Sequence, residues 1–421
     1  MKTKSVLGGV AALAAASLLL SGCGRADDAG EGPSEAITLD DGPATGTITV
    51  WAMGAEGEAL PDFVKAFEKE NPDVTIKVTP IPWDAAHNKI QTAIAGGNTP
   101  DIAMMGTTWM ADFGDAFATV PEGIPVDGFF DGASSTTRIG DRVAGVPWYV
   151  DTRVLYYRTD IAEKAGWTQA PTSWDELAQM ASDMQTKGGA TWGMRLPAGN
   201  DSFQGAMWMP WSAGAELTDG DGWTLDTPEM KAGFDYYESF FTSGIADPDV
   251  DTSPGATEAE FVDGTAPMVV EGPFLRGQLE AVGGEGFADK YTTAVLPADK
   301  GSVSFSGGAN LVVFDGSDNA SSAWKLVDWL SQPETQASFF EATGDLPAAT
   351  AAWDEPAVAG DDSIATFGTQ LETAKAPPVT TSWVQVAAKG DQALEALRRG
   401  TGSVSEVLKT LQGEADSIGL D

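Results

Sequence analysis

The chain has 421 residues, and its 62 aspartates and glutamates outnumber its 24 lysines and arginines, giving a formal net charge of −38. So negative a field repels phosphate backbones and offers no basic surface, so the composition excludes nucleic-acid binding and argues against binding to anionic lipid. The chain has one cysteine, Cys23, which leaves no disulfide framework and no cysteine-based metal site.

The first residues are typical of a secretory signal peptide, residues 1–22. Two lysines precede an apolar run, and small residues follow it. The run is too short and too rich in alanine and glycine to be a good membrane span. Leu20-Ser-Gly-Cys23 resembles the lipobox of bacterial lipoproteins, which implies cleavage before Cys23 and a diacylglycerol on its sulfur. We expect lipid anchoring at the extracytoplasmic face of the bacterial cell membrane; a plain secretory signal with a chance cysteine is the alternative.

Residues 23–45 contain almost no large apolar side chains, being mostly Gly, Ala, Asp, Glu, Pro and Ser. Such a segment cannot bury enough surface to fold, so it is expected to be a flexible tether. The remaining chain, 46–421, is too long for one core and predicts two lobes.

The first part of this region alternates strand and helix patterns. Apolar residues at every second position predict strands at 47–51, 74–78 and 101–105, and helical spacing predicts helices at 58–70 and 84–95. This order predicts a parallel sheet with crossover helices.

The rest of the chain continues the alternation, which defines an α/β protein. A long extended run covers 146–157, and capping boxes are predicted at Ser173–Glu176 and Ser331–Glu334. A hairpin turn is expected at 219–226, extended segments at 266–270 and 306–314, and helices at 229–243, 258–262, 321–330, 384–398 and 404–416.

Three patterns that mimic catalytic or metal sites are interpreted as coincidence. His87 is the only histidine, so neither a catalytic triad nor a zinc site is expected. Ser317-Asp-Asn319 and Ser322-Ala-Trp-Lys325 resemble penicillin-binding motifs, but their order is reversed and no Lys-Thr-Gly follows. Residues 247–258 carry acids at calcium-loop positions, but Thr252 stands where the loop needs glycine. We expect no metal and no cofactor, with calcium at 247–258 left open.

A series of short motifs resembles one known family across the whole chain from about residue 46. The similarity is to the extracellular solute-binding lipoproteins of bacterial ABC importers, in the carbohydrate branch related to maltose-binding protein. The motifs, in order, are Thr49-Val-Trp-Ala52, Ala66-Phe-Glu-Lys-Glu-Asn-Pro72, Gly97-Asn-Thr-Pro-Asp-Ile102, Gly145-Val-Pro-Trp148, Leu155-Tyr-Tyr-Arg158, Pro171-Thr-Ser-Trp-Asp-Glu-Leu177, Gly272-Pro273 and Gly344-Asp-Leu-Pro347.

This resemblance implies a periplasmic-binding-protein-like fold, in which two α/β lobes enclose a ligand cleft and three hinge segments join them. Carried onto this chain, lobe 1 covers 46–149 and 309–345, and lobe 2 covers 154–305 and 347–421. The hinges fall near 150–153, 306–308 and 345–347. The resemblance also implies a monomer that binds a sugar and delivers it to permease subunits in the membrane.

The binding of a sugar requires aromatic faces for its C–H surface and polar side chains for its hydroxyls. The resemblance points to Glu56, just after the first strand, and to Thr107, Thr108 and Trp109, after the third. The maltose binder has an acidic residue and an arginine where this chain has Thr108 and Trp109, which suggests a different sugar. A helix-terminal acid is the structural alternative for Glu56.

Tyr149, Asp151 and Arg153 are spaced by two in an extended run, so their side chains share one face. A carboxylate beside a guanidinium forms a fork for vicinal hydroxyls, with a structural ion pair as the alternative. The remaining candidates, each weighed against ordinary packing, are Trp83, Trp208, Trp211, Glu271, Phe274, Gly308, Asn310 and Trp383.

The sequence thus predicts a non-enzymatic capture protein for a di- or oligosaccharide. A glycerol phosphodiester is a second possible ligand, although one arginine against three candidate acids favours a neutral solute. An exported glycosidase is the rival class, because acids and tryptophans also build sugar-cleaving sites.

Overall fold

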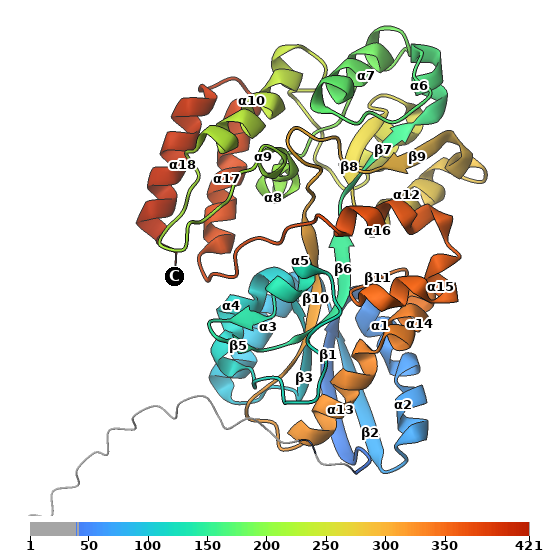
Figure 1. Cartoon of the computed structure of the whole chain (residues 1–421), viewed down its shortest axis with the longest axis vertical. Helices are drawn as coiled ribbons and strands as arrows, with labels where there is room; N and C mark the ends of the chain where they lie inside the picture. The colour runs from blue at the N-terminus through green and yellow to red at the C-terminus, as the bar shows by residue number, and fades with distance from the viewer. Residues whose placement is uncertain (1–38, 40–41, 421) are drawn as a thin grey trace, which may run out of the picture. The chain divides into compact units, whose positions relative to one another are not determined.

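The computed structural model describes Leu39 and residues 42–420. The predicted signal peptide, Cys23 and most of the predicted tether lie outside these residues. The described chain folds around two sheets, each covered by helices (Figure 1). Within the described part of the chain, no helix is long and apolar enough to cross a membrane.

The larger sheet has six strands in the order β11-β6-β10-β3-β1-β2. The predicted parallel unit is present, because β1 runs parallel to both β2 and β3. The returning strand β10 is antiparallel to β3 and β6. The strands are β1 Gly46–Met53, β2 Val74–Ile81, β3 Ile102–Gly106, β6 Val146–Thr152, β10 Ser306–Val313 and β11 Leu346–Pro347.

Helices cover both faces of this sheet. One face packs on Leu60, Phe67 and Trp324, and the other on Ile90 and Phe113. The helices on this side of the molecule are α1 Gly54–Phe63, α2 Lys65–Glu70, α3 Trp83–Gly96, α4 Met110–Phe113, α5 Asp131–Ser135, α13 Ala320–Ser331, α14 Pro333–Thr343 and α15 Pro356–Ala359, with 3-10 turns η1 Thr107–Trp109, η2 Gly114–Ala116 and η4 Thr350–Asp354 and a small ladder of β4 Arg138–Ile139 and β5 Arg142–Val143.

The smaller sheet has three strands in the order β8-β7-β9, all antiparallel. A separate apolar core, which includes Leu177, Phe203, Tyr237 and Trp383, lies among its helices. The elements are β7 Val154–Arg158, β8 Met268–Glu271, β9 Tyr291–Ala294, α6 Thr159–Ala165, α7 Trp174–Thr186, α8 Ser202–Ala206, α9 Trp208–Ser212, α10 Pro228–Thr242, α11 Ala256–Asp263, α12 Phe274–Gly283, η3 Phe287–Lys290, α17 Trp383–Arg398 and α18 Val404–Ile418. The turn η5 Asp362–Ile364 and helix α16 Ala365–Leu371 lie between the two sheets, and α16 contacts both β6 and β7. The α/β two-lobe expectation is confirmed.

The chain passes between the sheets at Arg153, the only residue between β6 and β7. The extended run predicted for 146–157 is therefore two strands in different sheets. A second crossing lies near Phe305, whose carbonyl accepts a 2.7 Å hydrogen bond from the Thr152 hydroxyl.

The structure places the third predicted hinge differently. Residues 345–347 end in β11, which pairs with β6 inside the larger sheet. The following helix α15 packs on α14 of that sheet. The chain crosses later, at Lys375, whose amide donates to Ser304 and whose carbonyl accepts from Ser306, each at 2.8 Å. The lobe boundaries otherwise stay a prediction.

The capping boxes differ from the sequence prediction in one case. Ser173 accepts the amide of Glu176 and caps α7 as expected. Ser331 caps nothing, because α13 continues through it and its hydroxyl donates to the Asp328 carbonyl. Pro333 at the first turn of α14 makes Gln332 the N-cap instead.

Candidate functional site

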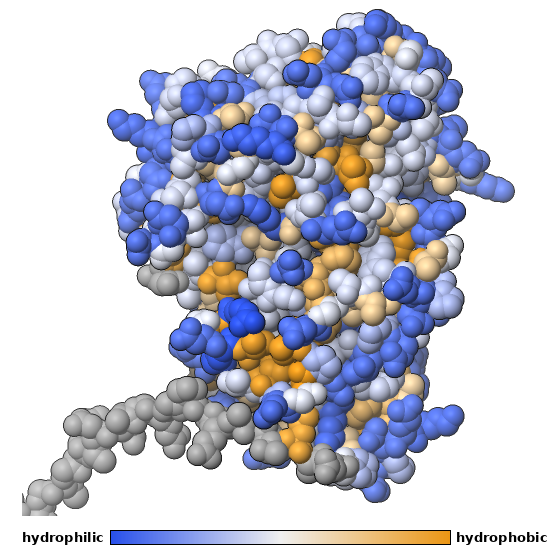
Figure 2. Space-filling model, viewed as in Figure 1, coloured by the Kyte–Doolittle hydropathy of each residue, from blue (hydrophilic) through white to orange (hydrophobic). Residues whose placement is uncertain are grey.

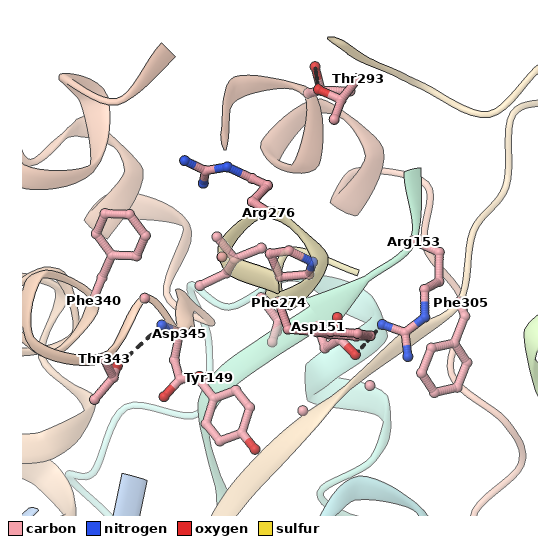
Figure 3. A pocket seen from close by; sticks show the side chains of 18 of the residues that line it. Tyr149, Asp151, Arg153, Phe274, Arg276, Thr293, Phe305, Phe340, Thr343 and Asp345 are labelled. Atoms are coloured by element: carbon pink, nitrogen blue, oxygen red, sulfur yellow. Dashed lines mark hydrogen bonds and ion pairs between the residues drawn. The ribbon is translucent and has the colours of Figure 1, made fainter. Parts of the chain in front are cut away.

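A cleft of about 1060 Å³ lies between the larger and the smaller sheet. Tyr149 and Asp151 of β6 form its floor, and Phe274 and Thr293 contribute from the side of the smaller sheet (Figure 3). This volume is at the upper end of the roughly 300–1000 Å³ that small-molecule sites occupy. The surrounding surface is mostly hydrophilic, with hydrophobic side chains in small groups toward the middle of the face (Figure 2).

At one end of the cleft lie three polar side chains, Glu56, Tyr149 and Asp345. Glu56, in the first turn of α1, is only 7% exposed. Burial, with the charges of Glu56 and Asp345, raises the pKa of Tyr149 well above its usual value. The phenol therefore stays protonated and remains a hydrogen-bond donor.

Asp345 is the most perturbed carboxyl in this group. Burial, and then the charge of Glu56, raises its pKa to about 7. Its Oδ2 is buried and has no hydrogen-bond partner within the described residues. Such an orphaned buried oxygen is costly, so a ligand hydroxyl that donated to it would gain a hydrogen bond at little further desolvation cost.

In the middle of the cleft, Arg153 joins side chains from both sheets. Its guanidinium pairs with Asp151 and lies 3.8 Å from the Glu271 carboxylate. It also lies over the rings of Phe274 and Phe305, at 5.3 Å and 5.8 Å from their centroids. Burial acts to lower the pKa of Arg153, but the two acids outweigh it and the pKa is raised, so the group stays cationic.

Aromatic side chains stand on both sides of the cleft. Trp83 and Trp109 meet edge to face, with centroids 5.5 Å apart. Trp83 is 37% exposed, and Phe274 on the other side is 50% exposed. Exposed rings of this size are available to stack on the apolar faces of a sugar.

The structure brings ten of the predicted residues together as cleft lining. Gly308 contributes through its backbone, since its φ is +114° and a Cβ there would lie 2.2 Å from the Tyr149 carbonyl oxygen. Only glycine lets β10 approach β6 this closely. The ten are Glu56, Trp83, Thr107, Thr108, Trp109, Tyr149, Asp151, Arg153, Phe274 and Gly308.

Five predicted residues are not part of this lining. Trp208, Trp211 and Trp383 are at most 3% exposed and pack in the core beside the smaller sheet, away from this lining; their role as ligand contacts stays a prediction. Asn310 is fully buried and donates to the Thr136 hydroxyl at 2.9 Å. Glu271 lines a smaller adjoining cavity instead.

Sequence reasoning missed several residues that line the cleft. Asp345 lies in a motif interpreted only as a hinge, and the acid after Gly344 was the available signal. Others come from segments without a distinctive pattern, because only the fold brings them to the cleft; they include Gln204, Arg276, Tyr291, Thr293, Phe305, Phe340, Thr343, Asp361 and Asp362.

The set-aside motifs have structural partners. His87 lies 2.8 Å from Asp112, and Ser317 donates to Asp101. In residues 247–258, Asp247 and Asp251 accept amides of their own loop. Within the residues that the structure describes, no group of three or more His, Cys, Asp or Glu side chains is placed to hold a metal ion.

Comparison with known proteins identifies the family. Residues 62–366 match the model of the bacterial extracellular solute-binding proteins. A solved sugar-binding protein, MalE of Xanthomonas citri, is 30% identical, with a TM-score of 0.83 over 89% of this chain and 97% of that one. The GacH receptor of Streptomyces glaucescens, solved unliganded and with acarbose, is 25% identical, with a TM-score of 0.76 over 89% and 98%.

Among curated relatives, a putative binding protein of Brucella abortus is 29% identical over 91% of this chain and 95% of its own length. The putative ABC transporter periplasmic-binding protein YcjN of Escherichia coli is 28% identical over 66% of each chain. The chain therefore belongs to the bacterial extracellular solute-binding proteins, as expected, and is a solute-binding protein of an ABC transporter. The proteins it resembles are binding proteins, not enzymes.

The raised pKa of Asp345 predicts a pH-dependent stability term. Because this pKa is about 7 in the folded protein and about 3.9 in an unfolded chain, folding is favoured below pH 4 relative to higher pH. The stabilisation is lost as the pH rises from about 4 to about 7. We expect Asp345→Asn to remove this loss and to gain on the order of 1–2 kcal/mol over wild type at pH 8, after solvent screening.

Urea unfolding at several pH values between 4 and 8 measures this term. Asp354→Asn changes an exposed acid outside the cleft and serves as the control, with the slope of the wild type. Parallel stability curves for wild type and Asp345→Asn would contradict the assignment.

Proposed function

We propose that this protein captures an extracellular carbohydrate, a di- or oligosaccharide, and delivers it to the membrane permease of its transporter. The observation that carries the proposal is the composition of the cleft, in which exposed rings from both sides flank a floor of hydroxyl-binding groups. Trp83 and Phe274 supply the rings, and Asp151, Arg153 and Tyr149 supply the polar floor. The sugar named for the Xanthomonas relative and the acarbose named for the Streptomyces receptor support the same ligand class.

The charges of the cleft favour a neutral ligand. Arg153 pairs with Asp151, and the other arginine in the lining, Arg276, lies 3.7 Å from Asp361. Neither guanidinium is left for a phosphate, and the lining carries further acids. A phosphodiester would have to displace these acids and lie among their charges, which disfavours it.

A glycosidase is the second candidate, because Asp345 resembles a general acid. A carboxyl with a pKa of about 7 beside another acid is what acid catalysis of glycoside cleavage requires. The family argues for binding without cleavage. Incubation with oligosaccharides separates the two candidates, because released product would overturn the binding-only function.

Delivery would follow from closure of the lobes around the sugar. Groups from both sheets face the cleft, so a ligand gains its full set of contacts only when they approach each other. The closed, loaded monomer would then dock on permease subunits driven by a separate ATPase.

A thermal-shift screen against a carbohydrate panel tests the ligand class. A binding sugar raises the melting temperature, since ligand at about 100 times its Kd adds about 2.7 kcal/mol to stability. We expect a positive shift with at least one di- or oligosaccharide and none with glycerol phosphodiesters. A shift with the phosphodiesters alone would replace the proposal.

Substitution of Asp151 is the most direct test of the polar floor formed by Tyr149, Asp151 and Arg153. We expect Asp151→Ala to weaken binding of the sugar found in the screen about tenfold or more, because a charged hydrogen bond is lost. Asp160→Ala is the matched control: Asp160 also pairs with an arginine, Arg158 at 2.8 Å, but lies outside the cleft. Equal affinities for Asp151→Ala and wild type would reject the floor assignment.

We further propose that Cys23 carries the lipid that keeps the protein at its permease. In cells, Cys23→Ser should move the protein from the membrane fraction to the medium or periplasm, with the fold unchanged. Fractionation and immunoblotting measure the distribution. A Cys23→Ser variant that stays in the membrane fraction would show that the anchor lies elsewhere.

A further inference from the structure

A second cavity of about 220 Å³ adjoins the main cleft on the side of the smaller sheet. We call it the side chamber; its wall includes Arg195, Ala198, Asn200, Asp201 and Glu271. Four residues line both spaces and form their common wall: Arg153, Gln204, Phe274 and Phe305. A volume below the roughly 300–1000 Å³ of complete ligand sites suits part of a ligand, not a whole one.

Arg153 stands at the junction of the two spaces. On one side it pairs with Asp151 of the main cleft, and on the other it lies 3.8 Å from Glu271 of the side chamber. Figure 3 shows its guanidinium between Asp151 and the ring of Phe305. The contact with Glu271 is the longer of the two, so a ligand hydroxyl can replace it while the Asp151 pair holds the arginine.

The chamber wall contains the one strained backbone position of the described chain. Asp201 is the only non-glycine residue with positive φ, at 59°, in the part that the structure describes. The Asp391 carboxylate holds this loop in place by accepting the amides of Asp201 and Phe203, at 3.0 Å and 2.8 Å. Backbone strain that neighbouring residues maintain in this way is typical of functional sites, so it points to a function for the Asp201 side chain.

The polar groups of the chamber are available to a ligand. Asn200 and Asp201 are exposed and Gln204 is half-buried, so all three side chains of the wall can be reached by a ligand. The two arginines of the wall already have carboxylate partners outside it, Arg195 with Glu260 at 2.6 Å and Arg153 with Asp151, so neither is left for an anion. The wall therefore suits a neutral group rich in hydroxyls.

We propose that the side chamber is a further subsite, which binds one additional sugar unit, terminal or branching, of an oligosaccharide that fills the main cleft. The proposal rests on the proposed carbohydrate function and makes it more specific. The solute is then longer than the main cleft alone requires, and the loop of Asp201 selects for that length. Phe305 and Phe274 supply the apolar wall, while Asp201 and Gln204 bind the hydroxyls of the added unit.

Titration calorimetry with α-1,4-glucan, β-1,4-glucan and β-1,4-galactan series, from disaccharide to hexasaccharide, tests the subsite. In wild type, affinity should rise about tenfold or more at the one length whose added unit enters the chamber. Ala198→Phe fills the chamber and should remove this rise, while shorter sugars keep their affinity. Ala259→Phe, the same change at an exposed site that lines neither cavity, should behave as wild type.

Asp201→Gly is a second variant that tests the subsite without adding a bulky side chain, so its result does not depend on whether Ala198→Phe folds correctly. Glycine accepts positive φ without strain, so the melting temperature should hold or rise, while the rise in affinity with length shrinks. A wild type with no rise beyond the shorter sugars, or an Ala198→Phe variant that keeps it, would overturn the subsite and leave the carbohydrate function standing. Failure of every series to bind would overturn both.

Discussion

The architecture of the cleft depends on the ion pair between the Arg153 guanidinium and the Asp151 carboxylate. Arg153 is the single residue between a strand of the larger sheet and a strand of the smaller one, so its backbone belongs to the passage between them. Its side chain pairs with Asp151 and lies over the rings of Phe274 and Phe305, so it contacts groups on both sides of the passage. Since a buried cation without partners is very costly, the acids around it are a structural requirement as well as part of the binding floor.

The acids at the other end of the cleft are under a different constraint. The pKa values of Asp345 and Tyr149 are raised by burial and by neighbouring acids, and no cation is among the causes. The Asp345 Oδ2 is buried without a hydrogen-bond partner among the described residues, and the surrounding fold offsets this cost. Binding groups held ready in this way lose little further free energy when a ligand donates hydrogen bonds to them, which is the physical sense of preorganisation. The strained Asp201 in the side chamber follows the same logic.

The surroundings of several candidate side chains depend on segments that are distant in the sequence. Trp208, Trp211 and Trp383 have indole rings of the kind that stack on sugars, but each packs in the core beside the smaller sheet. A tryptophan in a short helix or at a helix start has the same local pattern whether its ring faces a core or a cleft, and the difference depends on packing with distant segments. Asp345 lies in a motif that is visible in the sequence, but its raised pKa arises from burial and from the charge of Glu56, which is distant in the chain.

Local patterns along the chain are enough to predict the class of fold, the order of nearly every element, the parallel unit at the start of the larger sheet and the polar side chains on the floor of the cleft. These follow from local periodicity and from the alternation of side chains along one strand, which places Tyr149, Asp151 and Arg153 on one face. Only the tertiary structure decided which tryptophans reach the cleft, where the chain crosses for the third time, and that a side chamber opens beyond Arg153. Those features arise from contacts between residues far apart in the chain, which local patterns do not encode.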